Sequence, residues 1–373
     1  MNQNPLLARI KRIVLKFGTS VLADKQLHFD AGFFDQLALQ VAMFANRKLQ
    51  TIIVTSGAIA AGRSLLGLAA ERPRTLAGKQ AAAAVGQIQL MRFYQDAFAK
   101  QGLKIAQVLL THGDFQSRRR FLNARQTLLK LLELGVVPLI NENDTVSVEE
   151  ILVGDNDNLS ALVATLVDAD LLVLLSDIDG LYNADPNEDP NAKLIPVVDD
   201  VERALAFAQG TKNPGSTGGM ITKLQAARRV GAYGIPTLLM NGRKLAQLEA
   251  LAHGQVSGTL ILPKSKLRSR KHWIVHTLKP KGRITVDAGA ATALREQGKS
   301  LLPAGVASVE GQFGPGDPVE IAGPDGTALA RGLVSYGSTD IDRLKGCKSA
   351  DIDRILGYKT HDEIIHRDHL ALL

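Results

Sequence analysis

The sequence predicts an α/β fold with a mostly parallel central sheet sandwiched by helices, followed by a small β-rich module. From Arg12 to about Leu262, short apolar runs alternate with longer segments of helical spacing. The short runs are apolar throughout, which is typical of strands buried on both faces of a parallel sheet. After Leu262 the alternation stops, and short strands separated by turns rich in glycine and proline follow. We therefore expect a first domain at residues 8–262, a linker at 263–274 and a second domain at 275–373.

Each expected element rests on its own pattern. The strands of the first domain are short apolar runs at residues 12–17, 51–57, 104–110, 135–140, 169–176 and 235–240. Apolar spacing of three and four residues predicts helices at 30–48, from 58 onward, 76–100, 118–134, 158–167, 221–232 and 243–253. In the second domain we expect strands around 283–286, 305–309, 318–322 and 328–334.

Composition is that of a soluble globular protein. Of the 373 residues, 45% are hydrophobic and 22% are charged. No apolar run approaches the roughly 18 residues of a membrane-spanning helix, and the first residues are too weakly apolar for a signal peptide. The single cysteine, Cys347, excludes an internal disulfide and a thiolate metal cluster and fits a reducing compartment. We therefore expect a cytoplasmic protein with no membrane partner.

Polar residues follow several expected strands, at the edge where parallel sheets bind ligands. In chain order they are Lys16, Ser56-Gly57, Asp144 and Ser176-Asp177. Two interpretations of Lys16 remain open: a lysine that reaches to solvent, or a cation beside exposed backbone amides that binds phosphate. Ser56 is either a plain helix cap or part of a helix N-terminus that faces an anionic substrate.

Two further segments place polar residues or glycines before an expected helix. In G-D-N-D-N, residues Asp155, Asn156 and Asp157 precede a helix that we expect to begin near Asn158. A helix cap explains only one of these side chains, and the spacing lacks the glycine and glutamate of a calcium-binding loop. In T-G-G-M-I-T-K (217–223), glycines would let backbone amides approach a phosphate and a lysine follows; a capped, flexible loop is the alternative.

The sequence lacks the motifs of several common kinds of active site. No His or Cys cluster has zinc-ligand spacing, and no G-x-S-x-G elbow occurs. Neither the P-loop spacing nor G-x-G-x-x-G fits the glycine-rich segments. Two separated lysines, several carboxylates and glycine-rich helix starts remain, and this inventory suits phosphoryl transfer.

Seven ordered segments of the chain resemble the amino acid kinase family. They are V-L-K-F-G-T-S-V-L, I-V-T-S-G-A-I-A-A-G, F-L-N-A-R, P-L-I-N-E-N-D, V-G-D-N-D-N-L-S-A-L-V-A, S-D-I-D-G-L-Y and T-G-G-M-I-T-K. The C-terminal module resembles a PUA domain through G-R-I-T-V-D-A-G-A, S-L-L-P-A-G-V and D-R-I-L-G-Y. The resemblance thus extends from about Arg12 onward. One departure is Ser216, where the family pattern has a glycine before T-G-G-M.

The resemblance implies ATP-dependent phosphorylation of the γ-carboxylate of L-glutamate to L-glutamyl 5-phosphate, the first step of proline biosynthesis. Mg²⁺ is the implied cofactor, with no residue of the chain assigned as its ligand. The implied catalytic residues are Lys16, Lys223 and Asp157. The implied glutamate-binding residues are Ser56, Gly57, Asp144, Asp155 and Asn156. The implied ATP-binding residues are Lys16, Ser176, Asp177, Thr217, Gly218, Gly219, Met220, Ile221, Thr222 and Lys223.

These implied roles agree with the electrostatics of the reaction. A carboxylate that attacks a polyphosphate brings two negative groups together, and two lysines with Mg²⁺ offset the repulsion. The nucleophile is already ionised at neutral pH, so no general base is needed. An aspartate between the lysines would hold them close despite their mutual repulsion.

The resemblance also implies partners. We expect a homo-oligomer, a dimer or a tetramer, with L-proline as a feedback inhibitor and glutamate-semialdehyde dehydrogenase as a partner for product channelling. RNA binding by the PUA module is the alternative from another functional class, because the formal charge is +7 and the basic excess is denser after residue 262. We do not expect it as a physiological role, since the module lacks a basic stripe interleaved with aromatic residues.

Overall fold

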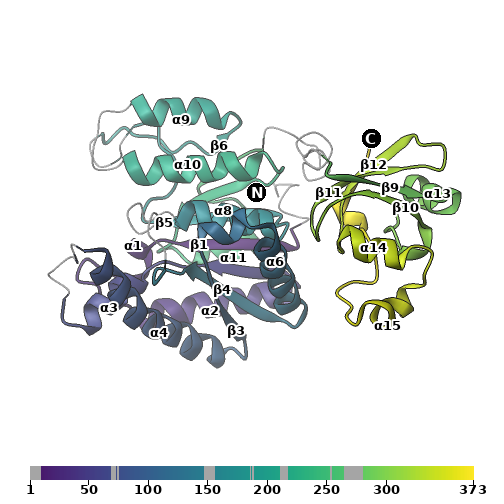
Figure 1. Ribbon diagram of the computed structural model, residues 1–373. Coiled ribbons are helices and arrows are strands. Elements are labelled where there is room, and N and C mark those ends of the chain that lie inside the picture. Colours follow the sequence, from purple (N-terminus) through teal and green to yellow (C-terminus); the bar gives the residue numbers. More distant parts are fainter. Residues whose placement is uncertain are drawn as a thin grey trace. The chain divides into compact units, whose positions relative to one another are not determined.

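The computed structural model describes residues 10–68, 73, 75–146, 156–184, 186, 189–210, 217–252, 254–263 and 280–373. These residues belong to two compact units, the first with an eight-stranded sheet and the second with a five-stranded sheet (Figure 1). Most of the expected linker at 263–274 lies outside the described residues, so the domain boundaries remain predictions. No helix among the described residues combines the length and the apolarity needed to cross a membrane.

The sheet of the first unit is mostly parallel, as the apolar strands predict. Its strand order is β3-β4-β2-β1-β5-β7-β8-β6, and only the β7–β8 pair is antiparallel. The strands are β1 (Arg12–Phe17), β2 (Gln50–Val54), β3 (Lys104–Leu110), β4 (Val136–Glu142), β5 (Leu171–Ser176), β6 (Val197–Val198), β7 (Thr237–Asn241) and β8 (Thr259–Ile261).

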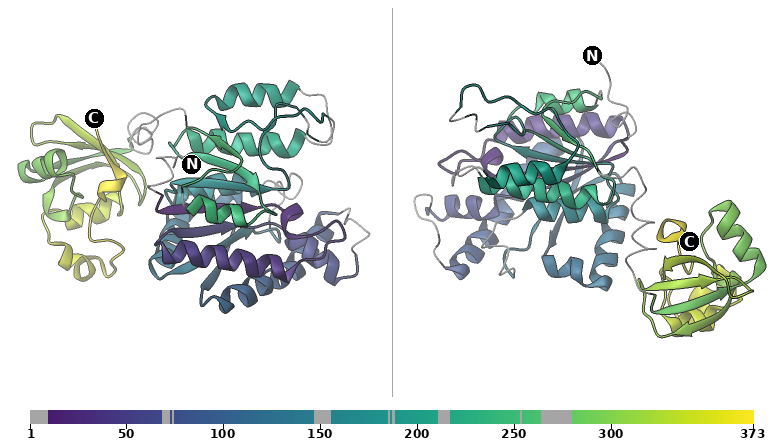
Figure 2. Two further views of the ribbon diagram at one scale, coloured as in Figure 1. Left: turned by 180° about the vertical axis from the view of Figure 1, so that it is seen from behind. Right: turned by 90° about the horizontal axis from the view of Figure 1, so that it is seen from above.

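Helices cover both faces of this sheet (Figures 1 and 2). They are α1 (Thr19–Leu22), α2 (Ala31–Asn46), α3 (Ala58–Leu65), α4 (Leu76–Lys100), α5 (His112–Gln116), α6 (Arg118–Glu133), α8 (Asn156–Leu166), α9 (Val201–Gly210), α10 (Thr217–Gly231) and α11 (Ala246–Ala252). Ile13, Leu15 and Phe17 of β1 pack against α2, α4 and α11 in one buried apolar core. Because side chains alternate along a strand, Val14 and Lys16 belong to the opposite face, which α8 covers.

Each helix and strand that the sequence predicts in the first unit is present, but the strand expected at 51–57 ends at Val54 and two helices begin earlier than expected. Helices α1, α5 and α9 and strands β6 and β8 were not predicted. β1, β3 and α4 begin and end where the sequence predicts. The helix expected near Asn158 begins at Asn156, and the helix expected at 221 begins at Thr217. The glycines of T-G-G-M predict a segment before the helix, but α10 includes these residues in its first turn. Glycine is a weak helix former, so local sequence does not reveal this start. The two-residue β6 and three-residue β8 are too short to show a period.

The second unit is a sheet of order β10-β9-β11-β12-β13, in which β9 and β11 run parallel. Its strands are β9 (Gly282–Val286), β10 (Val306–Gly311), β11 (Pro318–Ala322), β12 (Ala328–Leu333) and β13 (Leu370–Leu372). Its helices are α13 (Ala288–Gln297), α14 (Ser338–Leu344) and α15 (Ile352–Leu356). A separate apolar core includes Ile284, Ile321 and Tyr336. The four predicted strands are present, and β13 and the helices were not predicted.

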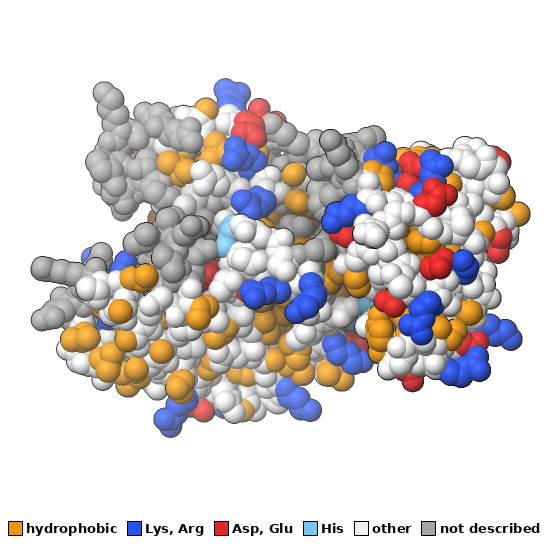
Figure 3. Space-filling model, in the orientation of Figure 1, with side chains coloured by type: hydrophobic (Ala, Val, Ile, Leu, Met, Phe, Trp, Pro, Cys, Tyr) orange, Lys and Arg blue, Asp and Glu red, His pale blue; other side chains and the backbone are white. Residues whose placement is uncertain are grey.

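Apolar side chains are exposed on the first unit over α3 and α4 (Figure 3). We call this set the apolar patch: Leu65, Leu66, Leu68, Val85 and Ile88. Ile88 is the most open of them, at 76% exposure. A contiguous exposed apolar surface is typical of a protein–protein interface.

Helices α3 and α4 cross with their backbones in contact, and two glycines make this possible. A Cβ atom added to Gly86 of α4 would lie 1.8 Å from the carbonyl oxygen of Ala58 in α3. A Cβ atom added to Gly62 of α3 would lie 1.8 Å from the carbonyl oxygen of Ala82. The crossing fixes the first turn of α3, which follows the end of β2, against α4.

Replacing Gly86 with alanine tests this crossing. The new methyl group forces the two helices apart, so we expect the free energy of unfolding to fall by at least about 2 kcal/mol. Urea unfolding followed by circular dichroism measures this. Gly113→Ala is the matched control, because its added Cβ would meet nothing closer than 3.7 Å. A midpoint for Gly86→Ala equal to that of the parent would contradict the crossing.

Candidate active site

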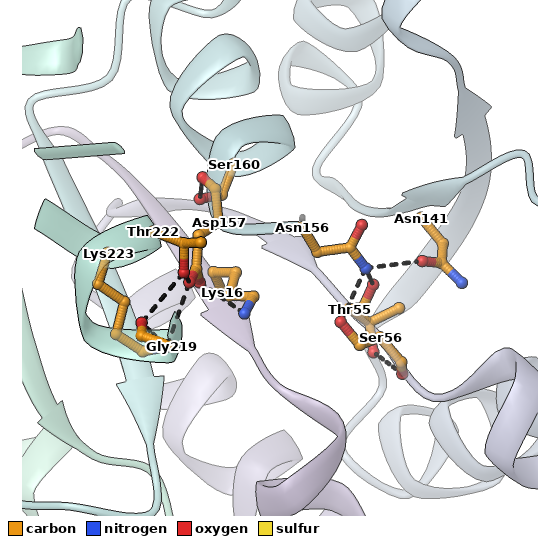
Figure 4. Close-up of polar contacts among 10 residues, drawn as sticks. All are labelled: Lys16, Thr55, Ser56, Asn141, Asn156, Asp157, Ser160, Gly219, Thr222 and Lys223. Carbon is orange, nitrogen blue, oxygen red and sulfur yellow. Dashed lines mark hydrogen bonds and ion pairs between the residues drawn. The ribbon is translucent and has the colours of Figure 1, made fainter. Parts of the chain in front are cut away.

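The polar residues singled out in the sequence gather at the carboxyl ends of β1, β2, β4 and β5, where α8 and α10 begin (Figure 4). These four strands are neighbours in the order β4-β2-β1-β5. Side chains from distant parts of the sequence therefore meet at one edge of the sheet. This is the edge at which open parallel sheets bind ligands.

A buried aspartate joins two lysines at the centre of the site. The Lys16 ammonium lies 2.6 Å from Oδ1 of Asp157, and the Lys223 ammonium lies 3.2 Å from Oδ2. The three side chains are only 7%, 5% and 13% exposed for Lys16, Asp157 and Lys223 respectively. Of the two interpretations open for Lys16, reaching to solvent is therefore wrong. The sequence-based prediction that Asp157 lies between the lysines agrees with this geometry.

Hydroxyl groups fix the aspartate further. The Thr222 hydroxyl donates to Oδ2 of Asp157 over 2.8 Å, and it also lies 3.0 Å from the carbonyl oxygen of Gly219. The Lys223 ammonium donates to the same Gly219 carbonyl over 3.1 Å. In α8, Ser160 donates to the backbone carbonyl of Asp157 over 2.6 Å. The first turns of α8 and α10 are thus tied together through one carboxylate.

The site keeps Asp157 ionised although it is buried. Burial alone would raise the pKa of the Asp157 carboxyl, but the nearby charges of Lys16 and Lys223 outweigh it and lower this pKa below its ordinary value. Hydrogen bonds from Lys16 and Thr222 act in the same direction. Two cations and one anion leave a net positive charge at the sheet edge. A phosphate group is the chemical partner that such a charge favours.

Next to this cluster, the Asn156 side chain connects α8 with the ends of β2 and β4. Its amide nitrogen donates to the backbone carbonyl of Thr55 over 2.8 Å and to the Ser56 hydroxyl over 2.7 Å. The same nitrogen lies 3.2 Å from Oδ1 of Asn141. The N-cap of α3 is Gly57, with no side-chain cap bond, so the plain-cap interpretation of Ser56 is wrong.

Gly57 adopts a left-handed backbone conformation with a φ of 105° and precedes the first turn of α3. Few residues other than glycine adopt this φ without strain. The unpaired amides and the dipole of a helix N-terminus favour an anionic group in front of it. Asp144 follows β4 and is half-buried, and burial raises its pKa to about 6. A helix N-terminus that favours an anion and a carboxylate therefore follow the neighbouring strands β2 and β4.

The predicted nucleotide-binding residues follow the neighbouring strand and helix. Ser176 is buried at the end of β5, and Asp177 after it is exposed. Met220 and Ile221 are half-buried in the first turns of α10. The segment predicted as a loop is therefore helical from Thr217 on. Of Thr217 and Gly218 the structure describes only the backbone, and Asp155 lies outside the described residues.

Sequence reasoning did not assign two side chains that the site uses. Asn141 was visible as the first polar residue after the apolar run of β4, within the quoted P-L-I-N-E-N-D segment. Gln87, which contacts Asn141, sits in the middle of the alanine-rich α4 and carries no local signal. Thr222 is expected to bind the nucleotide, and the structure adds a contact that the sequence does not predict, the bond from its hydroxyl to Asp157.

Comparisons with known proteins identify the family of the chain. Residues 11–241 match the model of the amino acid kinase family, and residues 282–356 match the PUA domain. A glutamate 5-kinase from Geobacter sulfurreducens is 52% identical over 99% of both chains. A glutamate 5-kinase from Thermus thermophilus is 49% identical over 97% of both chains. With a family match over most of its length and relatives of this similarity, the chain belongs to the amino acid kinase family.

Proposed function

We propose that the protein transfers the γ-phosphoryl group of ATP to the γ-carboxylate of L-glutamate, giving L-glutamyl 5-phosphate for proline biosynthesis. The observation that carries this proposal is Asp157 held between Lys16 and Lys223 at the carboxyl edge of the sheet. The similarity to glutamate 5-kinases over almost the whole chain supports the choice of substrate.

The transfer needs charge neutralisation and positioning rather than a base. A γ-carboxylate oxygen of glutamate forms a bond to the γ-phosphorus while the bond from that phosphorus to the bridging oxygen breaks, and its electron pair leaves with ADP. No proton has to move, because the attacking carboxylate is ionised. Lys16 and Lys223 stabilise the negative charge on the transferring group, and Asp157 keeps their ammonium groups close together.

Glutamate would bind on the β2–β4 side of the site. Gly57 and the first amides of α3 suit a carboxylate, and the Asp144 carboxylate suits the α-ammonium group. Asn156 donates to the Ser56 hydroxyl, and these two residues directly precede Asp157 and Gly57 in the chain, which supports their role in binding the acceptor. Asp155 would belong to the same set, because it precedes Asn156 in the G-D-N-D-N motif.

ATP would bind on the side of β5 and α10. Ser176 ends β5 and Asp177 follows it. Residues 217–223 form the first turns of α10, where backbone N–H groups can donate hydrogen bonds to phosphate oxygens. Ser216, which stands where the family pattern has a glycine, lies outside the described residues. Gly219 and Lys223 are present as the pattern requires.

Mg²⁺ fits this site as a companion of the nucleotide. Within the described ranges, no group of three or more His, Cys, Asp or Glu side chains is placed to hold a metal ion, and Asp157 is engaged by two lysines. Mg²⁺ commonly binds phosphate oxygens and water with few protein ligands. When bound, it would supply further neutralisation of phosphate charge.

The remaining proposals concern assembly and control in the cytoplasm. The apolar patch over α3 and α4 supports a homo-oligomer, and a monomer mass in sedimentation at micromolar concentration would contradict it. We keep L-proline as feedback inhibitor and glutamate-semialdehyde dehydrogenase as channelling partner. Proline titrated into the assay and co-sedimentation of the two enzymes test them.

The decisive experiment for the activity is a substrate panel with coupled detection of ADP. L-Glutamate is compared with L-aspartate, N-acetylglutamate and uridylate at saturating MgATP. We expect turnover that depends on L-glutamate. Turnover with another member of the panel and none with L-glutamate would overturn the proposed substrate.

Replacing Lys223 with methionine should lower kcat at least about 100-fold, because a charge next to the transferring phosphoryl group is lost. The fold should survive, which circular dichroism checks. Lys130→Met is the matched control, since Lys130 is exposed and pairs with Glu133 on the surface of α6. A kcat for Lys223→Met close to that of the control would exclude the proposed role.

The pH dependence of kcat/KM for glutamate should report the ionisation of the Asp144 carboxyl. Its pKa is about 6, so the carboxylate is mostly ionised at pH 7 and becomes protonated as the pH falls below 6. The neutral form cannot attract the α-ammonium group, so kcat/KM for glutamate should fall below pH 6. Asp144→Asn should have a low kcat/KM without this transition. A wild-type profile that is flat from pH 7 to 5 would contradict the assignment.

A further inference from the structure

The orientation of the Asn156 carboxamide is fixed by partners whose hydrogen-bonding roles are unambiguous. The backbone carbonyl of Thr55 can only accept, so the nitrogen of Asn156 faces it, over 2.8 Å. The carboxamide oxygen therefore points away from β2 and β4 (Figure 4). Among the residues that the structure describes, none donates to this oxygen. It is available to a donor on the acceptor substrate.

Asn141, near the end of β4, contacts the Asn156 carboxamide and also has a fixed orientation. Its Oδ1 accepts the backbone N–H of Glu142 over 2.9 Å, and an N–H can only donate, so the orientation of Asn141 is fixed as well. That oxygen lies 3.2 Å from the nitrogen of Asn156. The other end of Asn141, its Nδ2, donates to Oε1 of Gln87 over 2.9 Å. The three carboxamides form one chain, Gln87–Asn141–Asn156.

Packing alone does not explain a glutamine at position 87. Gln87 is 9% exposed, and its Nε2 has no hydrogen-bond partner within the described residues. An unpaired buried N–H lowers stability, which an aliphatic side chain would avoid. The neighbouring Gly86 sits at the close crossing with α3, so the backbone that carries Gln87 is held firmly. The oxygen of Gln87 is the part of the side chain that the structure uses.

We propose that Gln87 is a positioning residue for the acceptor substrate, acting through Asn141 on Asn156. Its oxygen anchors the amide chain at α4, and the chain presents the Asn156 oxygen to glutamate. Without the anchor, Asn141 loses its Nδ2 partner and the orientation of Asn156 is less restricted. This inference rests on the proposed function, because it assigns glutamate to the β2–β4 side of the site.

The test is Gln87→Leu, with steady-state kinetics for both substrates. We expect KM for glutamate to rise about tenfold, while KM for ATP and kcat change less than twofold. Gln95→Leu is the matched control, because Gln95 lies on the same helix and is exposed. Gln87→Glu keeps an oxygen acceptor at the position and should bring KM for glutamate to within about threefold of the wild type, even if burial of the carboxyl lowers its Tm.

A double-mutant cycle with Asn156→Ala separates positioning from general damage. If Gln87 acts through Asn156, adding Gln87→Leu to Asn156→Ala should change KM for glutamate less than twofold. Full additivity, an equal rise in KM for ATP, or an unchanged KM for glutamate in Gln87→Leu would overturn the inference. If Gln87→Leu does not fold, failure of Gln87→Glu to stay within threefold would do so. A wild type without glutamate turnover would instead overturn the proposed function.

Discussion

The site depends on the buried carboxylate of Asp157. Two ammonium groups brought this close together repel each other, and an isolated buried carboxylate is strongly unfavourable. Placed between Lys16 and Lys223, the aspartate removes both difficulties at once. The carboxylate remains ionised, and the cluster keeps a net positive charge where the phosphates of ATP would arrive. Removing Asp157 would leave two buried ammonium groups uncompensated, whereas removing either lysine would leave a neutral ion pair and abolish the net positive charge.

Contacts at both ends of α8 fix the position of this carboxylate. Asp157 lies in the first turn of the helix, where the dipole favours a negative group. At the other end, Arg12 and Arg125 donate to backbone carbonyls, and Arg125 also pairs with Asp168 at 2.5 Å. Cations complement the C-terminal end of a helix dipole. Arg125 is the arginine of the F-L-N-A-R segment, which thereby acquires a structural role.

Neighbouring residues at the start of α8 face different halves of the site. Successive side chains on an α-helix point about 100° apart. Asn156 is therefore directed to the ends of β2 and β4, and Asp157 to β1 and α10. One helix start thus serves the acceptor side and the phosphoryl side together. Gly86 allows α3 and α4 to pack closely, and its neighbour Gln87 contacts Asn141 on the acceptor side.

The sequence by itself determined the α/β class, the places of the longer strands and helices and the motif residues at the sheet edge, because apolar periodicity and glycine-rich helix starts are local signals. It misplaced the starts of α8 and α10, since polar residues and glycines are weak helix formers when their tertiary contacts are ignored. Only the tertiary structure decided that Thr222 bonds Asp157 and that Gln87 reaches Asn141. The residues of these two pairs lie 65 and 54 positions apart in the chain, and contacts at such separations follow from how strands and helices pack, which no local pattern encodes.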